Sequence, residues 1–189
     1  MKKYSKTMII VAMMAVAALV YYYYLSNKTP SQDATQQSIA NEEIAALTTR
    51  DISANYPESP KEVVKLYVRI VKQYYDTELT NEQIESLGKQ ARLLFDDELK
   101  SKQTETEFLD ALKTDISSYR SIGRKISDYT IDSSSNVDYK TLDDKKYASL
   151  VVLYYIRENN NLNNSYTKFT LRQDNNGKWK ILFWEVVNS

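Results

Sequence analysis

Apolar positions fall first in one unbroken run, residues 8–25, which reads MIIVAMMAVAALVYYYYL and carries no charge. An α-helix of this length rises about 27 Å, close to the roughly 30 Å hydrocarbon core of a bilayer. Tyrosine rings favour the headgroup level, and four of them close the run: Tyr21, Tyr22, Tyr23 and Tyr24. Lysines at positions 2, 3 and 6 precede it, so the positive-inside rule places residues 1–7 in the cytoplasm as a basic tail. The pattern predicts a single-pass signal anchor in the cell membrane, with the lipid bilayer around residues 8–25 and the following chain extracytoplasmic.

Two other interpretations of this run remain open. Ala15-Val16-Ala17 is typical of a signal-peptide cleavage site, but it lies inside the run and would leave an apolar region of only about seven to nine residues. Cleavage there would release a secreted domain. The third interpretation is a buried globular helix, although the length and the flanking lysines and tyrosines favour the anchor.

Polar residues dominate the next segment. Residues 26–38 (SNKTPSQDATQQS) contain Pro30 and no aliphatic side chain larger than alanine, which is typical of a flexible stalk. Apolar residues then return at helical spacing over residues 39–52 and predict a short helix against the domain. They are Ile39, Ile44, Leu47 and Ile52. Asn55-Tyr56-Pro57 breaks the pattern, so residues 26–55 are expected to form a stalk with a short helix.

Capping signals predict three amphipathic helices after Tyr56. Each signal is followed by apolar residues three or four apart, the pattern of one core-facing stripe. The signals are Ser59-Pro60 with Glu62, Thr80 with Gln83, and Thr104 with Glu107. The stripes are Val63, Val64, Tyr67, Ile70, Val71 and Tyr74; Ile84, Leu87, Ala91, Leu94 and Phe95; and Phe108, Leu109, Leu112, Ile116 and Tyr119. Gly123 stands where a left-handed residue would end the third helix.

After Gly123 the pattern changes to β-branched and aromatic segments separated by turn residues. Asp143-Asp144 and Asp174-Asn-Asn-Gly177 are turn signals, and residues 159–164 are predicted to be a polar loop. The predicted strands are residues 125–131, 137–141, 147–156, 166–172 and 178–187. Helices first and antiparallel strands afterwards indicate an α+β fold, with three helices packed on the sheet and one extracytoplasmic domain over residues 56–189.

The last strand, KWKILFWEVV, has apolar side chains on both faces. Alternation places Trp179, Ile181 and Phe183 on one face, and Leu182, Trp184 and Val186 on the other. An antiparallel sheet with one face in water would show apolar residues on one side only. Helices are expected to cover one face, and either a partner or curling of the sheet the other. The pattern predicts a homodimer or an envelope protein partner there, with a wrapped monomeric sheet as the alternative.

Composition narrows the chemistry that this domain can carry. Without cysteine or histidine, the chain has no disulfide, no zinc finger, no cysteine nucleophile and no serine–histidine nucleophile. Its three glycines are too far apart for a phosphate-binding glycine loop. We therefore expect no catalytic residue, no cofactor and no metal site.

The net charge of zero is the sum of two unlike parts. The first 28 residues carry four lysines and no acid, so the remaining 161 residues carry a charge of −4. A mildly acidic domain lacks the basic face that nucleic-acid binding requires, so no nucleic-acid partner is expected. An exported domain without cysteine is associated with Gram-positive envelopes, in which disulfides are little used.

Two stretches of the domain resemble a known superfamily. The opening Ser59-Pro60 helix with Val63, Val64 and Tyr67, and the closing hairpin from Leu171 through Asp174 and Gly177-Lys178-Trp179-Lys180-Ile181-Leu182, are similar to the nuclear transport factor 2-like superfamily. The resemblance covers about residues 56–189. It implies a cystatin-like α+β cone, in which a curved sheet folds around the helices and leaves a pocket.

The segment Thr49-Arg50-Asp51-Ile52, with Asn55-Tyr56-Pro57 and Ser59-Pro60, resembles the start of an uncharacterised family of membrane-anchored proteins from Firmicutes within that superfamily. This second resemblance implies fold and placement but no activity. Some members of the superfamily are enzymes that hold an aspartate, tyrosine or histidine in the cone. Because this chain has no histidine, the resemblance leaves only a tyrosine–aspartate version.

Aromatic residues are the candidates for lining such a pocket. They are Tyr67, Tyr154 and Trp184, with Tyr74 and Tyr155 beside them. The alternative is that these rings belong to the core, with hydroxyls at its rim.

Charged residues are weaker candidates. Asp128 and Asp138 lie on predicted strands near tyrosines, but carboxylates at such positions are usually exposed. Asp96-Asp97-Glu98 lacks the glycine and the alternating oxygen ligands of a calcium loop, so a solvated acidic cluster is favoured. Arg157 and Arg172 are expected at the surface or paired with acids.

The anchor, the stalk and a domain without a catalytic arrangement together favour a membrane-anchored extracytoplasmic binding or assembly module. The alternative is a small-ligand-binding protein or a tyrosine–aspartate enzyme that uses the cone pocket.

Overall fold

The computed structural model describes residues 17–23 and 32–188 and divides the chain into two units, Met1–Asn41 and Glu42–Ser189. In the first unit, residues 17–23 are helical, and Tyr21, Tyr22 and Tyr23 are exposed. The rest of the predicted anchor, including Tyr24, lies outside the described residues. Within the described ranges, no helix has both the length and the apolar character needed to cross a membrane.

Helix α2 (Gln32–Thr48) corrects part of the predicted stalk, because residues 32–38 are helical. Alanine and glutamine recur in this segment, and neither glycine nor proline interrupts it after Pro30, so helix propensity favours this result. The end of α2 belongs to the second unit, where Ile44, Leu47 and Ile52 are buried in the core. The compact unit therefore begins before Tyr56, the start expected from the sequence.

The structure confirms the three capped helices, α3 (Pro60–Asp76), α4 (Asn81–Leu93) and α6 (Glu105–Ser121). The second helix is shorter than predicted, because Leu94 and Phe95 lie beyond its end. The capping boxes of α4 and α6 are complete, with each N-cap threonine and its partner bonded in both directions. At α3, Ser59 Oγ accepts from the Glu62 amide at 3.2 Å, but Glu62 forms an ion pair with Lys65 instead of returning the bond. Gly123 ends α6 with a φ of 64°, as the sequence predicts.

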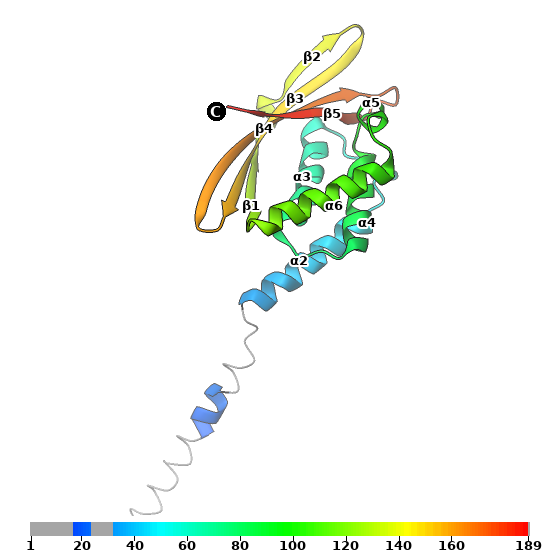
Figure 1. Cartoon of the computed structure of the whole chain (residues 1–189). Helices are drawn as coiled ribbons and strands as arrows, with labels where there is room; N and C mark the ends of the chain where they lie inside the picture. Colours follow the sequence, from blue (N-terminus) through cyan, green and yellow to red (C-terminus); the bar gives the residue numbers. More distant parts are fainter. Residues whose placement is uncertain (1–16, 24–31, 189) are drawn as a thin grey trace, which may run out of the picture. The chain divides into compact units, whose positions relative to one another are not determined.

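Between α4 and α6 the chain contains a short helix that the sequence pattern did not indicate, α5 (Asp97–Ser101). The chain leaves α4 at Leu94, and Phe95 pairs with Ile181 of the sheet in a parallel bridge. This bridge fixes the α4–α5 junction against the last strand (Figure 1).

One antiparallel sheet follows, in the order β1-β3-β4-β5, and β2 pairs with the first half of β3 while β1 pairs with its second half (Figure 1). The strands are β1 (Arg124–Ile131), β2 (Asp138–Leu142), β3 (Lys145–Glu158), β4 (Asn161–Gln173) and β5 (Trp179–Val187). The predicted polar loop over residues 159–164 is wrong, since Glu158 pairs directly with Asn161. Asn159 adopts a φ of 52°, which asparagine tolerates, so a tight turn replaces the loop and the asparagines after it join β4.

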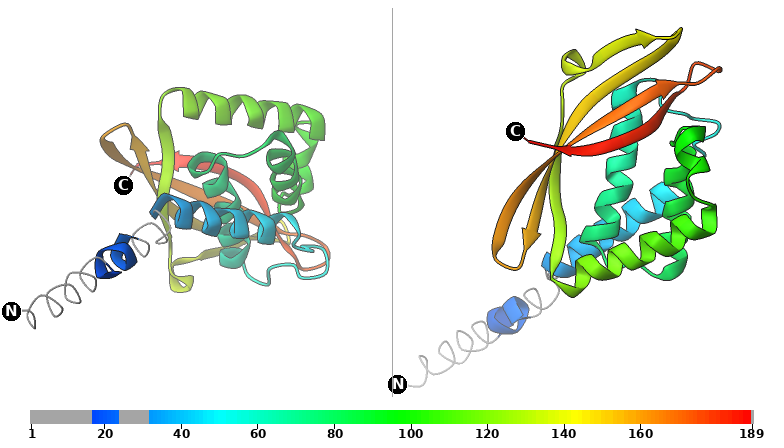
Figure 2. Two further views of the ribbon diagram at one scale, coloured as in Figure 1. Left: turned by 90° about the horizontal axis from the view of Figure 1, so that it is seen from below. Right: turned by 45° about the horizontal axis from the view of Figure 1, so that its top comes forward.

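Helices α3, α4 and α6 lie on one side of the sheet (Figure 2). This inner face supplies the core residues Ala148, Leu150, Val152, Phe169, Leu171 and Ile181. The observed architecture is therefore α+β, with helices packed on an antiparallel sheet.

A β-bulge in β5 changes which side chains reach this inner face. Ile181 pairs with Leu171 and Phe183 with Thr170, so Leu182 is one extra residue in the strand. The extra residue reverses the alternation, and Trp184 packs against Tyr67 and other rings on the helix side. The predicted separation of Trp184 from Ile181 onto opposite faces is therefore wrong.

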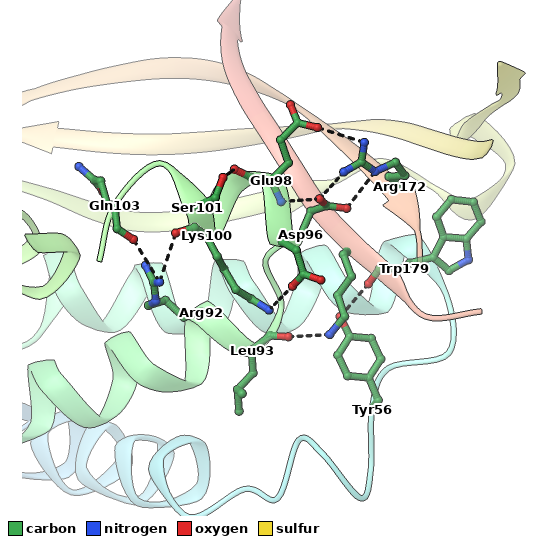
Figure 3. Close-up of polar contacts among 12 residues, drawn as sticks. Tyr56, Arg92, Leu93, Asp96, Glu98, Lys100, Ser101, Gln103, Arg172 and Trp179 are labelled. Carbon is green, nitrogen blue, oxygen red and sulfur yellow. Dashed lines mark hydrogen bonds and ion pairs between the residues drawn. The ribbon is translucent and has the colours of Figure 1, made fainter. Parts of the chain in front are cut away.

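Polar contacts connect the α4–α5 junction and Tyr56 to β4 and β5 at one end of the sheet, and Figure 3 shows their geometry. Arg172 of β4 donates to both carboxylate oxygens of Asp96, the N-cap of α5, and to Glu98 at 3.1 Å. The Tyr56 hydroxyl donates to the Trp179 carbonyl at 2.7 Å, and Lys180 Nζ donates to the Leu93 carbonyl at 2.8 Å. We call this group the closed end; it comprises Tyr56, Leu93, Asp96, Glu98, Arg172, Trp179 and Lys180.

Candidate functional site: an aromatic pocket between α3, α6 and the sheet

Away from the closed end, the inner face is hollow. A pocket of about 410 Å³ lies between α3, α6 and the strands β1, β3, β4 and β5. Pockets of this size accept small organic molecules. We call it the aromatic pocket, because rings from α3, α6, β3, β4 and β5 line it, among them Tyr67, Tyr75, Phe108, Tyr154, Phe169 and Trp184.

The structure places Tyr67, Tyr154 and Trp184 in this one pocket, together with Tyr74. Trp184 reaches it because of the β5 bulge. Tyr155 does not line the pocket, because it lies on the opposite face of the sheet, where it is paired with Asp128.

Three buried phenols belong to the lining, and we call them the floor of the pocket. Tyr67, Tyr74 and Tyr154 are 9%, 3% and 7% exposed. Burial raises the pKa of each above the usual tyrosine value, and the proximity of Tyr67 raises the pKa of Tyr74 and Tyr154 further. The floor therefore presents neutral hydroxyl groups at physiological pH.

The Tyr74 hydroxyl is buried, and none of the described residues offers it a hydrogen-bond partner. Buried polar groups in folded proteins nearly always have such partners, so each exception requires an explanation. Tyr74 is one of the residues that line the pocket, and its hydroxyl oxygen is itself buried.

The mouth of the pocket lies between α6 and the second half of β5. The lining residues there are solvent-exposed: Ala111 and Asp115 of α6, and Trp184 (40%) and Val186 (75%) of β5. A molecule in solvent can thus enter between these two elements.

Asp115 is the charged group of the pocket lining, and no lysine or arginine is found among the described residues that line it. The Asp115 carboxylate accepts a hydrogen bond from the Tyr75 hydroxyl. Burial, followed by this bond, raises the pKa of Tyr75. The Tyr75 ring in turn packs on Tyr119, with 4.4 Å between ring centroids.

Asp115 was not among the site residues predicted from the sequence. Its position contained a usable signal, because Asp115 is three residues after Leu112 and four before Tyr119, both on the apolar stripe of α6. A carboxylate at the border of such a stripe is placed to reach into a space beneath the helix.

Two cations lie near the pocket walls but do not line it. The Arg92 guanidinium is 5.4 Å from the Phe108 ring centroid and donates to the carbonyls of Lys100 and Gln103. The Arg124 guanidinium is 5.3 Å from the Tyr119 centroid and pairs with Glu158 at 2.6 Å. Both charges already have partners of their own.

The other charged candidates lie away from the pocket. Asp128 is exposed and accepts from the Tyr129 amide, while Asp138 is exposed and lies 2.9 Å from Lys140 Nζ. Arg172 is held by Asp96 and Glu98 at the closed end, and Arg157 is exposed. In the described part of the chain, no group of three or more acidic side chains is arranged to hold a metal ion.

The outer face of the sheet is opposite the helices and carries a second set of apolar side chains. Val151, Leu153, Tyr155 and Tyr166 are half-buried there, and Phe183 is 42% exposed. A hollow of about 430 Å³ lies over β2, β3 and β4, lined by exposed or half-buried strand residues such as Lys140, Tyr147 and Lys168. Both faces of the sheet are therefore apolar, and the predicted partner on this outer face stays a prediction.

Comparison with known proteins identifies a family but no individual relative. The chain matches none of the curated proteins. It does match a family model, described as a domain of unknown function (DUF6715), over residues 1–184. Because that match spans most of the sequence, the chain belongs to the DUF6715 family.

Proposed function

We propose that the domain is a binding module for a small organic molecule and that the aromatic pocket is its site. The observation that carries this proposal is a pocket of about 410 Å³ lined by aromatic rings, together with the unpartnered hydroxyl of Tyr74, one of its lining residues. Leaving a buried hydroxyl without a partner costs about 1–3 kcal/mol, which a ligand with a hydrogen-bonding atom at that depth would recover. The exposed lining residues at the mouth give the ligand a route in.

Binding is better supported than catalysis. Proton transfer needs a group whose pKa lies near the working pH. The floor tyrosines have raised pKa values and stay protonated, so they act as hydrogen-bonding groups rather than bases. Neither strand carboxylate considered as a base lines the pocket.

The test uses N-phenyl-1-naphthylamine, an uncharged dye that becomes fluorescent in apolar sites, and the purified full-length chain. The dye should bind the unchanged protein, and Ala111→Phe should abolish binding because the larger ring obstructs the mouth. Thr114→Phe is the matched control, since Thr114 is exposed on the same helix outside the pocket lining. Equal binding by all three proteins, or by none, would contradict the proposal.

The proposal includes the cellular position of the module. Residues 8–25 are a single-pass anchor, residues 1–7 are cytoplasmic, and the domain is extracytoplasmic. The uncharged run, the lysines before it and the tyrosines at its end support this orientation. Helices followed by an antiparallel sheet, with a pocket between them, likewise support membership of the nuclear transport factor 2-like superfamily.

The absence of cysteine makes the orientation easy to test. Leu162→Cys places a thiol at an exposed position of the domain, and Ser5→Cys places one in the basic tail. In intact Gram-positive cells, a membrane-impermeant maleimide should label only the first variant, and permeabilised cells should show both labelled. Labelling of Ser5→Cys in intact cells would overturn the orientation, and a mature N-terminus after Ala17 would replace the anchor with a cleaved signal peptide.

The outer face supports a second proposal, association with a second copy of the chain. At this face Lys168 of β4 pairs in register with Glu185 of β5. A two-fold axis through the face can set each charge against the opposite charge of the other copy, around apolar residues such as Phe183. Light scattering of the full-length chain should show a dimer that Phe183→Lys dissociates. Leu93→Lys, at a helix position of similar exposure (41%), should leave the dimer intact, and a monomeric unchanged chain would contradict the proposal.

A further inference from the structure

We propose that the aromatic pocket selects an organic cation, an amine whose ammonium group pairs with Asp115 at the mouth and whose uncharged body lies along the aromatic walls. This inference rests on the proposed function and adds the chemical class of the ligand.

The charges of the lining are the first support. Asp115 contributes a carboxylate, and the described lining contains no basic side chain to offset it. Arg92 and Arg124 are occupied by carbonyl groups and by Glu158, respectively. An anionic ligand would therefore meet a negative charge at the mouth without a compensating cation.

The free capacity of Asp115 is the second support. A carboxylate has about four lone-pair positions, and the bond from Tyr75 uses one of them. The remaining positions can accept from an ammonium group. Asp115 is exposed, so solvent weakens this attraction, and selectivity for the cation should be moderate.

Aromatic rings next to the mouth are the third support. Electron-rich ring faces attract cations when the charge comes within about 6 Å of the ring centroid. Trp184 lies at the mouth, and Tyr75, whose hydroxyl donates to Asp115, lines the same pocket. An ammonium group bound to Asp115 thus lies in a pocket whose lining is rich in aromatic rings.

The floor of the pocket sets a different requirement. Tyr67, Tyr74 and Tyr154 are neutral and buried, and the Tyr74 hydroxyl lacks a partner among the described residues. Placing a charge among them would cost desolvation without a counter-ion. The end of the ligand that reaches the floor is therefore uncharged and carries a hydroxyl or carbonyl group.

Three small probes with the same ring and different charge test this inference: tyramine (cationic), tyrosol (neutral) and 3-(4-hydroxyphenyl)propionate (anionic). Calorimetric titration of the full-length chain should give tyramine at least a tenfold lower Kd than tyrosol, with the propionate weakest. Asp115→Asn should raise the Kd of tyramine to that of tyrosol, while retaining an acceptor for the Tyr75 hydroxyl. Asp110→Asn is the matched control, because Asp110 lies on the same helix outside the pocket lining, and it should leave the Kd of all three probes unchanged.

The outcomes separate the inference from the proposed function. If the uncharged dye binds in the pocket but the three probes bind equally, bind regardless of Asp115, or do not bind at all, the ligand class is overturned and the binding function stands. If Ala111→Phe has no effect on any of these molecules, the pocket itself is overturned. Tyr74→Phe should weaken tyramine and tyrosol by a similar factor, and a tyramine-specific loss would contradict the assignment of the uncharged end to the floor.

Discussion

The closed end and the aromatic pocket both contain buried polar groups, but they differ in how those groups are satisfied. At the closed end, the Asp96 side chain is only 6% exposed and its carboxylate binds Arg172 and the Glu98 amide. The Tyr56 hydroxyl there has a carbonyl partner at 2.7 Å. At the aromatic pocket, the Tyr74 hydroxyl is equally deep and has no partner among the described residues.

This difference separates a structural polar group from a group that is available for function. Folding selects for satisfied buried polar atoms, because an unsatisfied one lowers stability. The closed end follows that rule, and the aromatic pocket does not. The comparison therefore predicts that mutations at the closed end reduce stability, and that matching mutations at the pocket reduce binding.

The largest expected effect is the loss of stability in alkali. The raised pKa values of Tyr67, Tyr74 and Tyr154 mean that these phenols ionise more easily in the unfolded chain, whose tyrosines titrate near pH 10. Their contribution is fully present below pH 10 and is lost as pH rises above it. Three such groups cost about 4 kcal/mol at pH 11, since each contributes about 1.4 kcal/mol per pH unit.

Urea unfolding at pH 9 and pH 11 measures this loss. Tyr154→Phe should reduce the difference between the two pH values by the share of one phenol, about 1.4 kcal/mol. Tyr139→Phe is the control, because Tyr139 is 57% exposed and its removal should leave the pH dependence unchanged. Absorbance at 295 nm showing all 16 tyrosines ionised in the folded protein near pH 10 would contradict the prediction.

The next largest effect belongs to the closed end. Asp96→Ala leaves Arg172, whose side chain is 18% exposed, without its main partner and removes the N-cap of α5. Breaking a buried ion pair from one side costs about 3–5 kcal/mol, so we expect a loss of about 3 kcal/mol in the free energy of unfolding. Glu98→Ala removes only the contact from a side chain that is 57% exposed and should cost less than about 1 kcal/mol. Urea unfolding measures both losses. Equal losses in the two variants would contradict the prediction that Asp96 contributes more to the free energy of unfolding than Glu98 does.

Local signals explain how much of this fold the sequence could predict. The capping pairs of α4 and α6 and the left-handed Gly123 depend on residues within a few positions of one another, so their patterns predict the helix boundaries. The turn at Asn159 was missed because a polar stretch after a strand is also typical of a loop. Its true form depends on pairing between two strands, which a single segment does not contain.

Predicting the aromatic pocket would require contacts between residues that are even farther apart in the sequence. Tyr67 and Tyr154 are apolar-stripe and strand positions that any core would use, and only packing reveals the space between them. Trp184 faces this space because the register between β4 and β5 shifts at Leu182. In KWKILFWEVV both faces are apolar, so alternation alone does not reveal the extra residue.

The smallest predicted effects compare two hydroxyl groups directly. Tyr56→Phe removes the donor to the Trp179 carbonyl and should cost about 1 kcal/mol in the free energy of unfolding. Tyr74→Phe removes a hydroxyl that has no partner, so without ligand it should leave stability unchanged or raise it by up to about 1 kcal/mol. Tyramine binding should show the reverse order, with Tyr74→Phe weakened and Tyr56→Phe unchanged. Urea unfolding and calorimetric titration of the two full-length variants therefore test the distinction between a structural and a functional hydroxyl. A stability loss from Tyr74→Phe as large as that from Tyr56→Phe would contradict this distinction.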